Sequence, residues 1–314
     1  MTSARTLLDA ALEVPVVTSF TRFGYHVRSR LFDWTPLGDL DLSGRSIALT
    51  GPTSGIGLAA AHQLAAMGAD LVLLARDPVK LDPLAAELHA TPVPVDLGDL
   101  DAVREAARQV AERGRLDAVL HNAGALLAER ETTAAGHEVT VATQVLGPFL
   151  LTRLLMPALR AEGPGRVITM SSGGMYTEPL TVSQLEMPPG DYRGTTAYAR
   201  AKRAQVTLNE LWAEQVPADQ IVFHALHPGW VDTPGVAAAL PRFRRVVGPA
   251  LRTPAEGADT LVWLAAAREP LGSSGRFWLD RRPRSIHRLP HTRRSDTAER
   301  RRRLWEWCEA QVAD

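Results

Sequence analysis

Short apolar segments rich in Val, Ile and Leu alternate with longer segments of helical periodicity from Arg45 onward. Six apolar segments are predicted strands, at residues 46–50, 70–75, 92–95, 116–121, 166–171 and 221–226. Most are apolar throughout, as in strands that a parallel sheet buries on both faces. Between them lie five predicted helices, at residues 57–67, 79–88, 99–113, 134–161 and 197–214. This alternation predicts a single α/β domain, a doubly wound parallel sheet of the Rossmann type with helices on both faces.

Two flanks lie outside this alternation and divide the chain into three expected parts. We expect an N-terminal arm over residues 1–43, the α/β domain over 44–280, and a basic C-terminal extension over 281–314 with a terminal helix. Apolar residues of the arm stand near helical spacing, at Leu7, Leu8, Ala11, Leu12, Val16 and Val17. Two interpretations stay open: the arm packs on the domain or a partner subunit, or it contacts a membrane surface.

The C-terminal extension begins with an unusual run of charge. Residues 280–303 contain ten arginines and three acidic residues. A charge run of this kind is most often a solvated face, which is the interpretation we favour. The alternative is a contact with phosphate-bearing lipid or another acidic surface. Peripheral membrane contact is therefore kept open for both flanks.

Composition excludes several classes of function. A formal net charge of zero gives no bulk reason to expect nucleic acid as a partner. Cys308 is the only cysteine, so an internal disulfide and a cysteine-based metal cluster are both excluded. The histidines lack metal-ligand spacing, and we expect no metal site. The longest uncharged run, 46–69, is broken by glycines and Pro52, and the first residues lack a leader pattern. We expect a cytoplasmic protein, and leave self-association as a homo-oligomer open.

A glycine-rich turn follows the first predicted strand and opens the first predicted helix. It reads T-G-P-T-S-G-I-G from Thr50 to Gly57. A pyrophosphate must approach the backbone N–H groups of a helix N-terminus closely, and glycine permits that approach. This position between a strand and a helix predicts a dinucleotide site. The expected cofactor-binding residues of the turn are Gly51, Thr53, Ser54, Gly55, Ile56 and Gly57.

The end of the second predicted strand indicates which dinucleotide is preferred. NAD-selective enzymes place a carboxylate there to hold the ribose 2′-OH, whereas this chain has Ala75 followed by Arg76. A guanidinium can bind a 2′-phosphate that a carboxylate would repel. We therefore expect NADP(H) rather than NAD(H). Asp96 and Leu97 end the third strand, where the carboxylate can accept from the adenine amino group. After the fourth strand, Asn122, Ala123 and Gly124 should let the chain pass close to the ribose.

A phenol and an ammonium stand one helical turn apart at Tyr198 and Lys202. A free tyrosine has a pKa near 10, and a neighbouring cation lowers it, so that the phenol can exchange a proton at neutral pH. The preceding strand ends at Ser171 and Ser172, and one of these hydroxyls can hold a substrate oxygen beside the phenol.

These motifs together resemble the short-chain dehydrogenase/reductase family over residues 45 to about 280. The resemblance implies that Ser172, Tyr198 and Lys202 are catalytic and that Tyr198 and Lys202 also contact the cofactor. It implies that the segment with Pro228, Gly229, Val231 and Thr233 closes over the nicotinamide and pyrophosphate. The stretches 171–175, 227–236, 257–265 and 274–281 are similar to the subfamily of dehydrogenase/reductase member twelve, which also carries an N-terminal arm.

Two positions depart from the pattern of that family. His121 replaces the first asparagine of N-N-A-G, and Gln144 aligns with the catalytic asparagine. In the family, the backbone carbonyl at the second position holds a water that links the lysine to solvent. Pro148 has no N–H to bond to the Gln144 carbonyl, so we expect that carbonyl to stay free. Gln144 is therefore interpreted as a tolerated variant of the catalytic group.

The resulting hypothesis is reversible hydride transfer between NADP(H) and a carbonyl or alcohol substrate. Segments 173–196 and 230–252 should border the substrate, and their apolar residues suggest an apolar small molecule: Met175, Tyr176, Leu180, Trp230, Val236 and Leu240. Each of these residues can equally be packing. The alternative function is a dinucleotide-binding sensor or partner protein with weak or no catalysis, which only His121 and Gln144 favour.

Overall fold

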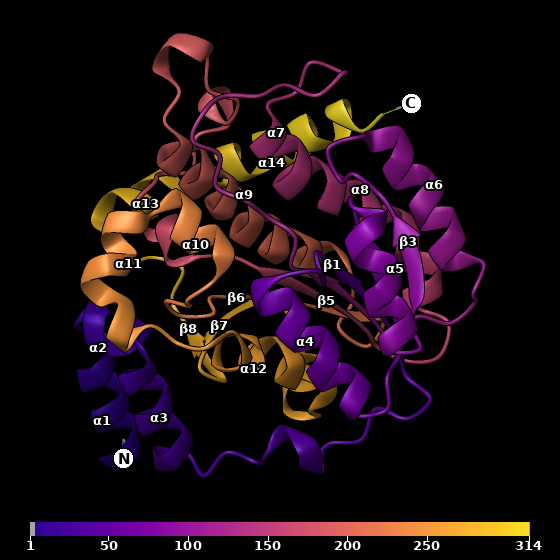
Figure 1. Ribbon diagram of the computed structural model, residues 1–314. Coiled ribbons are helices and arrows are strands. Elements are labelled where there is room, and N and C mark those ends of the chain that lie inside the picture. The colour runs from indigo at the N-terminus through magenta and orange to yellow at the C-terminus, as the bar shows by residue number, and fades with distance from the viewer. Residues whose placement is uncertain (1–3, 314) are drawn as a thin grey trace.

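Eight strands form one sheet, in the order β3-β2-β1-β4-β5-β6-β7-β8. The computed structural model describes residues 4–313 (Figure 1), so residues 1–3 and 314 of the two expected flanks lie outside the described residues. The strands are β1 (Ser46–Thr50), β2 (Asp70–Ala75), β3 (Thr91–Pro94), β4 (Ala118–His121), β5 (Gly165–Met170), β6 (Ile221–Leu226), β7 (Arg276–Leu279) and β8 (Arg282–Arg284). Every neighbouring pair is parallel except β7 and β8, which are antiparallel. The predicted fold class is confirmed.

The six predicted strands are all present, within two residues of their predicted bounds. Sequence reasoning missed β7 and β8. The reason for β8 is plain, since its sequence is Arg-Pro-Arg and it lies at the sheet edge, where an apolar run is not needed. The expected domain boundary at residue 280 falls in the turn between these two strands, so the extension begins inside the sheet.

Helices cover both faces of the sheet (Figure 1). On one face α4 (Gly55–Ala66), α5 (Pro78–Glu87) and α12 (Pro254–Ala266) bury small and branched apolar residues against it. On the other face lie α6 (Leu100–Ala111), α8 (Gly147–Leu159) and α9 (Gly194–Gln215), with α14 (Ala298–Gln311) packed outside α9. The shorter helices are α1 (Ala4–Glu13), α2 (Val16–Phe20), α3 (Arg22–Leu31), α7 (Val139–Val141), α10 (Pro234–Ala239), α11 (Pro241–Val247) and α13 (Pro290–Ser295).

The long helix predicted over 134–161 begins later and contains an irregular turn. Glu138 caps α7 by accepting from the backbone N–H groups of Thr140 and Val141, and a π-helical turn over Ala142–Leu146 then leads into α8. By length and composition alone, Val139–Leu159 could cross a membrane, but 72% of its apolar window is buried inside the fold. This segment is a core helix, packed against α6 and the sheet.

The N-terminal arm packs on the domain through buried charge. The Arg28 guanidinium is fully buried and donates to the Asp9 carboxylate at 2.8 Å, to the Asp280 carboxylate at 2.7 Å and to the Ser19 carbonyl at 3.0 Å. Arg252 donates to the same Asp280 carboxylate at 2.6 Å from the domain side. Asp280 thus joins the arm to the loop that precedes α12.

Several arginines of the expected solvated run are in fact paired inside the structure, which corrects that interpretation. Arg281 is buried and donates to the Asp259 carboxylate at 2.7 Å, and Arg284 donates to Asp9 of the arm. A run of like charges can be buried where acidic residues from distant segments meet it, which local sequence does not reveal. Only part of the run, such as Arg302 and Arg303 on α14, is solvent-exposed.

Candidate active site

The predicted site residues gather at one edge of the sheet because the strands that precede them are parallel. They follow the carboxyl ends of β1 through β6: Gly51 after β1, Arg76 after β2, Asp96 after β3, Asn122 after β4, Ser172 after β5 and Pro228 after β6. Tyr198 and Lys202 reach the same region from α9, since Lys202 bonds to the last residue of β5. The structure therefore brings together residues that span more than half of the chain.

The glycine-rich turn has a shape that only glycine allows. Gly51 has a φ of +67°, in the left-handed region. A Cβ on Gly57 would lie 2.0 Å from the Gly51 carbonyl oxygen, which is an impossible contact. Ser54 precedes α4 without a side-chain cap, so the first N–H groups of the helix are left for another acceptor. This open helix N-terminus fits the pyrophosphate of a dinucleotide.

Asn122 has a structural role that its position in the sequence did not reveal. Its side-chain amide donates to the carbonyls of Thr50 and Gly51, each at 3.0 Å. The Thr50 hydroxyl in turn accepts from the backbone N–H groups of Asn122 and Ala123, each at 3.0 Å. The Asn122 side chain therefore ties the end of β4 to the glycine-rich turn. The expectation that the backbone from Asn122 to Gly124 passes close to the ribose stays a prediction.

The end of β2 presents an exposed cation where the adenosine half of a dinucleotide would lie. Ala75 is buried, whereas the Arg76 side chain is 78% exposed and its guanidinium stands 3.9 Å from the Asp96 carboxylate. One Asp96 oxygen accepts from the Gly98 N–H at 2.8 Å, and the carboxylate is half-exposed. The Leu97 side chain is buried in the core, so only its backbone can face a ligand.

Ser172, Tyr198 and Lys202 form one connected group. Ser172 begins a short turn after β5, where its hydroxyl accepts from the Gly174 N–H at 3.3 Å and lies near enough to the Tyr198 phenol to lower the pKa of that phenol. The Lys202 ammonium donates to the Met170 carbonyl at 2.9 Å and lies 5.3 Å from the centre of the Tyr198 ring. Only 2% of Lys202 is exposed, which keeps the ammonium away from water.

Burial decides the acidity of these groups. It raises the pKa of Tyr198 above the usual value, although the hydrogen bond with Ser172 acts in the opposite direction. Burial also lowers the pKa of Lys202 to about 7. In this structure the loss of solvent at Tyr198 outweighs the lowering of its pKa expected from the Lys202 cation, so the net pKa is raised.

The Gln144 carbonyl is not free, which corrects the second expectation from the family pattern. It accepts from the side-chain amide of Gln205 on α9 at 2.6 Å. Pro148 removes the ordinary helical donor, as predicted, and Gln205 supplies another. The Gln144 side-chain amide donates to the Ala125 carbonyl at 2.9 Å. Gln205 was missed because the contact arises only when α9 packs against the π-helical turn.

Gly124 allows Gln144 and Lys202 to approach the same point. A Cβ on Gly124 would lie 2.8 Å from Gln144 Oε1 and 3.3 Å from Lys202 Nζ. Gln144 Oε1 is buried and accepts no hydrogen bond from the described residues. A larger residue at this position would therefore displace the ammonium or the amide. Glycine at 124 is required by packing at the site as well as by any ligand.

His121 lies behind this group, on the α8 side of the sheet. Its Nε2 is 2.8 Å from the Thr152 hydroxyl, and burial lowers the pKa of His121 to about 4. His121, Gln144 and Gln205 together line a cavity of about 30 Å³, which is large enough for a water molecule. The two positions that depart from the family pattern thus border one small cavity.

Stability should fall on acidification because His121 is buried as a neutral group. Between pH 6.5 and about 4 the unfolded chain binds a proton at this histidine and the folded chain does not. Each such histidine then removes about 1.4 kcal/mol of unfolding free energy per pH unit. We expect His121→Asn to reduce the slope of unfolding free energy against pH by roughly this amount, as measured by urea titrations from pH 4.5 to 6. Equal slopes for the variant and the wild type between pH 4.5 and 6 would contradict this expectation. Above pH 7.5 the slopes of the variant and the wild type should agree.

The loop after β6 carries the expected cofactor-closing residues. Gly229 has a φ of +82°, and a Cβ there would lie 2.2 Å from Nε of the buried Arg252. Val231 forms a parallel bridge with Arg252, and the Thr233 hydroxyl caps α10 by accepting from the Val236 N–H at 3.2 Å. A Cβ on Gly55 would lie 3.2 Å from the Thr233 methyl group, so this loop touches the start of α4. Pro228 and its neighbours thus lie beside the expected pyrophosphate position.

The expected apolar substrate pocket is only partly supported. Met175, Tyr176 and Leu180 are buried in the core, where they pack instead of lining a site. Trp230, at the start of the loop, and Val236 and Leu240, near α10, stay half-buried. These last three are the apolar residues still able to meet a substrate.

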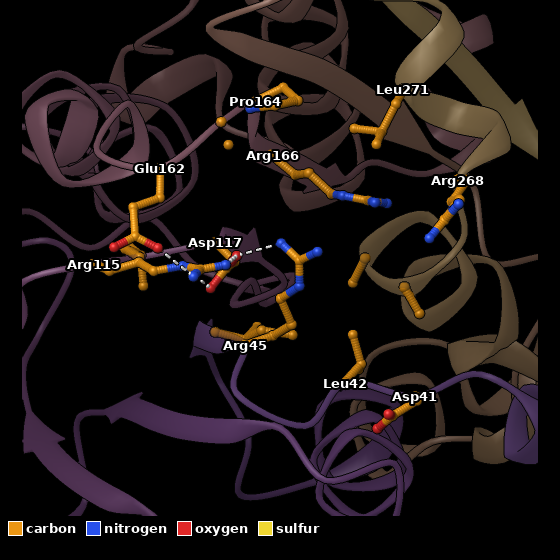
Figure 2. A pocket seen from close by; sticks show the side chains of 16 residues that line it. Asp41, Leu42, Arg45, Arg115, Asp117, Glu162, Pro164, Arg166, Arg268 and Leu271 are labelled. Atoms are coloured by element: carbon orange, nitrogen blue, oxygen red, sulfur yellow. Dashed lines mark hydrogen bonds and ion pairs between the residues drawn. The ribbon is translucent and has the colours of Figure 1, made fainter.

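A larger cavity lies at the opposite edge of the sheet (Figure 2). It measures about 440 Å³ and is lined by residues at the amino ends of β1, β4 and β5, among them Arg45, Asp117 and Arg166. Arg45 and Arg115 are both paired with Asp117 in this cavity. Ligands of open α/β sheets bind at the carboxyl ends of the strands, so this cavity is not the dinucleotide site.

The chain is similar to known proteins along most of its length. Residues 45–242 match the family described as short chain dehydrogenase. The human protein named dehydrogenase/reductase SDR family member 12 is 38% identical over 296 residues, covering 89% of this chain and 90% of that protein. Retinol dehydrogenase 12 of Bos taurus is 32% identical over 308 residues, covering 92% and 94%. The crystal structure of L-sorbose reductase from Gluconobacter frateurii with NADPH and L-sorbose has a TM-score of 0.61 at 25% identity, covering 76% of this chain and 96% of that one.

Proposed function

We propose an activity from one premise: the chain belongs to the short-chain dehydrogenase/reductase family, whose members are oxidoreductases that use NAD or NADP. On this premise it interconverts an apolar carbonyl compound and the corresponding alcohol, with NADP(H) as its cofactor. Ser172, Tyr198 and Lys202 are its catalytic residues. The observation that carries the proposal is the placement of Ser172 beside Tyr198, with the buried Lys202 ammonium 5.3 Å from the centre of the Tyr198 ring, at the strand ends where a dinucleotide fits.

The residues present fit a dinucleotide. The pyrophosphate would meet the turn from Gly51 to Gly57, where a side chain at Gly57 has no room. Arg76 would hold a 2′-phosphate, Asp96 the adenine amino group, and Lys202 the nicotinamide ribose. When bound, this cofactor supplies or accepts a hydride at the substrate carbon. The protein must supply the proton and the positioning.

The substrate oxygen is held between two hydroxyl groups in this proposal. The Tyr198 hydroxyl donates its proton to the carbonyl oxygen during reduction and recovers a proton from the alcohol during oxidation. The Ser172 hydroxyl donates a hydrogen bond to the same oxygen and fixes its position beside Tyr198. The Lys202 ammonium lies against the Tyr198 ring, and its charge favours the phenolate that remains after proton transfer. Tyr198 and Ser172 are the groups that contact the reacting atoms.

An apolar substrate is supported by two observations. The half-buried residues Trp230, Val236 and Leu240 are apolar, and they follow the strand end nearest to the expected nicotinamide position. A relative that covers most of the chain is named a retinol dehydrogenase, and retinol is an apolar alcohol. A screen of aldehydes, ketones and alcohols of increasing chain length, with both cofactors, tests the proposal. Activity that rises with apolar surface is the expected result, and activity confined to sugars would contradict it.

The preference for NADP(H) depends on Arg76. NADPH should bind more tightly than NADH by about 1–3 kcal/mol, because the exposed guanidinium forms a charge-assisted contact with the 2′-phosphate. Arg76→Ala should remove most of that difference in calorimetric titrations of both cofactors. Lys80→Ala is the matched control, since Lys80 is 69% exposed and only four residues away. An unchanged preference in the Arg76 variant, or an equal loss in the Lys80 variant, would contradict this assignment.

Gln144→Asn restores the side chain usual in the family and tests whether Gln144 impairs the site. Gln205 holds the backbone carbonyl, which stays in place whichever side chain is present. We therefore expect the turnover number to change by less than about tenfold, or about 1.4 kcal/mol in barrier. Steady-state kinetics with a substrate from the screen measures the turnover numbers of the variant and the wild type. A gain of several hundredfold would mean that the natural chain is a weak catalyst, and the sensor hypothesis would then be preferred.

A further inference from the structure

The N-terminal arm is an inverted amphipathic structure. Its polar residues face the domain: Asp9 is 4% exposed and Ser19 and Arg28 are fully buried. Arg28 links Asp9 to Ser19, since it donates to the Asp9 carboxylate, to the Ser19 hydroxyl and to the Ser19 carbonyl. An ordinary surface helix buries its apolar stripe and exposes its charges. In this arm the buried face is largely ionic, with Phe20 of α2 as a buried large apolar side chain.

The outward face of the same arm is apolar. Ten large apolar side chains are exposed among the described residues, and six of them lie between residues 7 and 23, with exposures of 41–81%. These six residues, which we call the outer face, are Leu7, Leu8, Val14, Val16, Val17 and Phe23. Single exposed apolar residues are common on proteins, but a concentration of this kind marks a surface that meets a partner.

Exposed arginines lie near the outer face. The acidic residues Asp9 and Glu13 are engaged inward by Arg28, and Asp33 is paired with Arg5. On the arm, Arg22 is half-exposed and paired with Glu256 at 3.3 Å, and Arg30 is exposed. Asp9, Glu13 and Asp33 are thus paired with arginines while Arg30 faces solvent; the two further acidic residues of the arm, Asp39 and Asp41, are exposed.

The neighbouring helix α11 extends this surface. The Phe20 ring of α2 lies 5.9 Å from Trp230, which in turn lies 5.1 Å from Phe243 of α11. This helix carries the exposed residues Arg242, Arg245 and Val246, the last of which is 81% exposed. Figure 1 shows α11 directly above α2, on the same side of the molecule as α1 and α3. Apolar and basic side chains therefore continue from the arm onto the helix that follows the cofactor loop.

We propose that the outer face docks on the surface of a lipid bilayer that contains anionic lipids. Exposed apolar side chains would enter the boundary between headgroups and acyl chains, and the arginines would meet lipid phosphates. A second copy of the chain is a poorer fit, because a two-fold interface would bring the same arginines of both copies together. The proposal does not depend on the proposed activity, although a membrane surface beside α10 and α11 suits an apolar substrate.

The test is flotation of the full chain with vesicles of phosphatidylcholine alone and of phosphatidylcholine with 30% phosphatidylglycerol. We expect the wild type to float with the anionic vesicles and L7Q/L8Q/F23Q to lose at least about 30-fold in partitioning, because apolar burial in lipid scales with the area removed from water. These three side chains are 56–61% exposed, so the fold should be unaffected, as a thermal melt can verify. Val79→Gln on α5, at a residue that is 80% exposed, is the matched control and should float like the wild type.

Outcomes of three kinds would overturn the proposal: in wild-type flotation, in the triple variant and in the oligomeric state. The first is a wild type that does not float with anionic vesicles, or that floats equally with neutral ones. The second is a triple variant that floats as well as the wild type. Third, if sedimentation velocity showed a dimer that the triple variant loses, a second copy would be the occupant of the outer face. None of these measurements uses turnover. Failure of the membrane proposal would therefore not affect the proposed activity, and failure of the proposed activity would not affect the membrane proposal.

Discussion

Tyr198→Phe lowers the turnover number by at least about 100-fold while the affinity for the cofactor is retained, because general acid catalysis typically contributes about 10²–10⁴-fold. The substitution removes the phenolic proton and keeps the ring that packs on Lys202. Steady-state kinetics with an active substrate and calorimetric titration of NADPH measure the two parts of this expectation. Unchanged turnover would refute the proposed mechanism.

Tyr176→Phe is the matched control for this experiment. Tyr176 is also a buried tyrosine close to Ser172 in the chain, but its hydroxyl donates to the Ser285 carbonyl at 2.9 Å, away from the site. Its loss should cost about 1 kcal/mol of stability, as for one neutral hydrogen bond, and leave turnover unaltered. A comparable loss of turnover in both variants would indicate that the substitutions reduce turnover by disturbing the folded structure.

The second large effect concerns stability. Asp280→Asn should lower the unfolding free energy by about 3–5 kcal/mol, because it leaves Arg252 buried without a counter-charge and removes one of the carboxylates that surround Arg28. Burial alone would raise the pKa of Asp280, but Arg252 and Arg28 hold it below the usual value. Asparagine suits the left-handed backbone at this position, where φ is +54°, so the change isolates the charge. Urea titration at pH 7 measures the loss.

Asp232→Asn provides the comparison for an exposed ion pair. Asp232 is bound to Arg244 at 2.7 Å, with both side chains largely in solvent. Its loss should cost less than about 1 kcal/mol. Similar losses for both variants would show that the Asp280 cluster contributes no more than a surface ion pair. In that case the arm would be held by other contacts, such as the packing of Phe20.

Sequence by itself determined the sheet and the order of its elements. Three of the six predicted strands have the predicted bounds, because each is a continuous apolar run that must be buried on both faces. Parallel strands put their carboxyl ends at one edge, so the placement of the glycine-rich turn, Ser172 and Tyr198 together also followed from the sequence. The expectation of a helical arm followed from the spacing of its apolar residues.

Tertiary structure decided what lies between elements that are distant in the sequence. The Gln144 carbonyl is occupied by Gln205 of another helix, and the acidity of Tyr198 and Lys202 is set by how deeply the fold buries them. Composition does not predict which arginines are exposed to solvent. Arg28 and Arg281 are buried because they pair with Asp280 and Asp259, which are distant from them in the sequence. The arm is the clearest case. Its periodicity predicts an amphipathic helix, but the sequence does not show which face is buried. Asp9 and Arg28 bind each other and residues of the domain in the folded protein, and these contacts turn the ionic face inward and the apolar face outward.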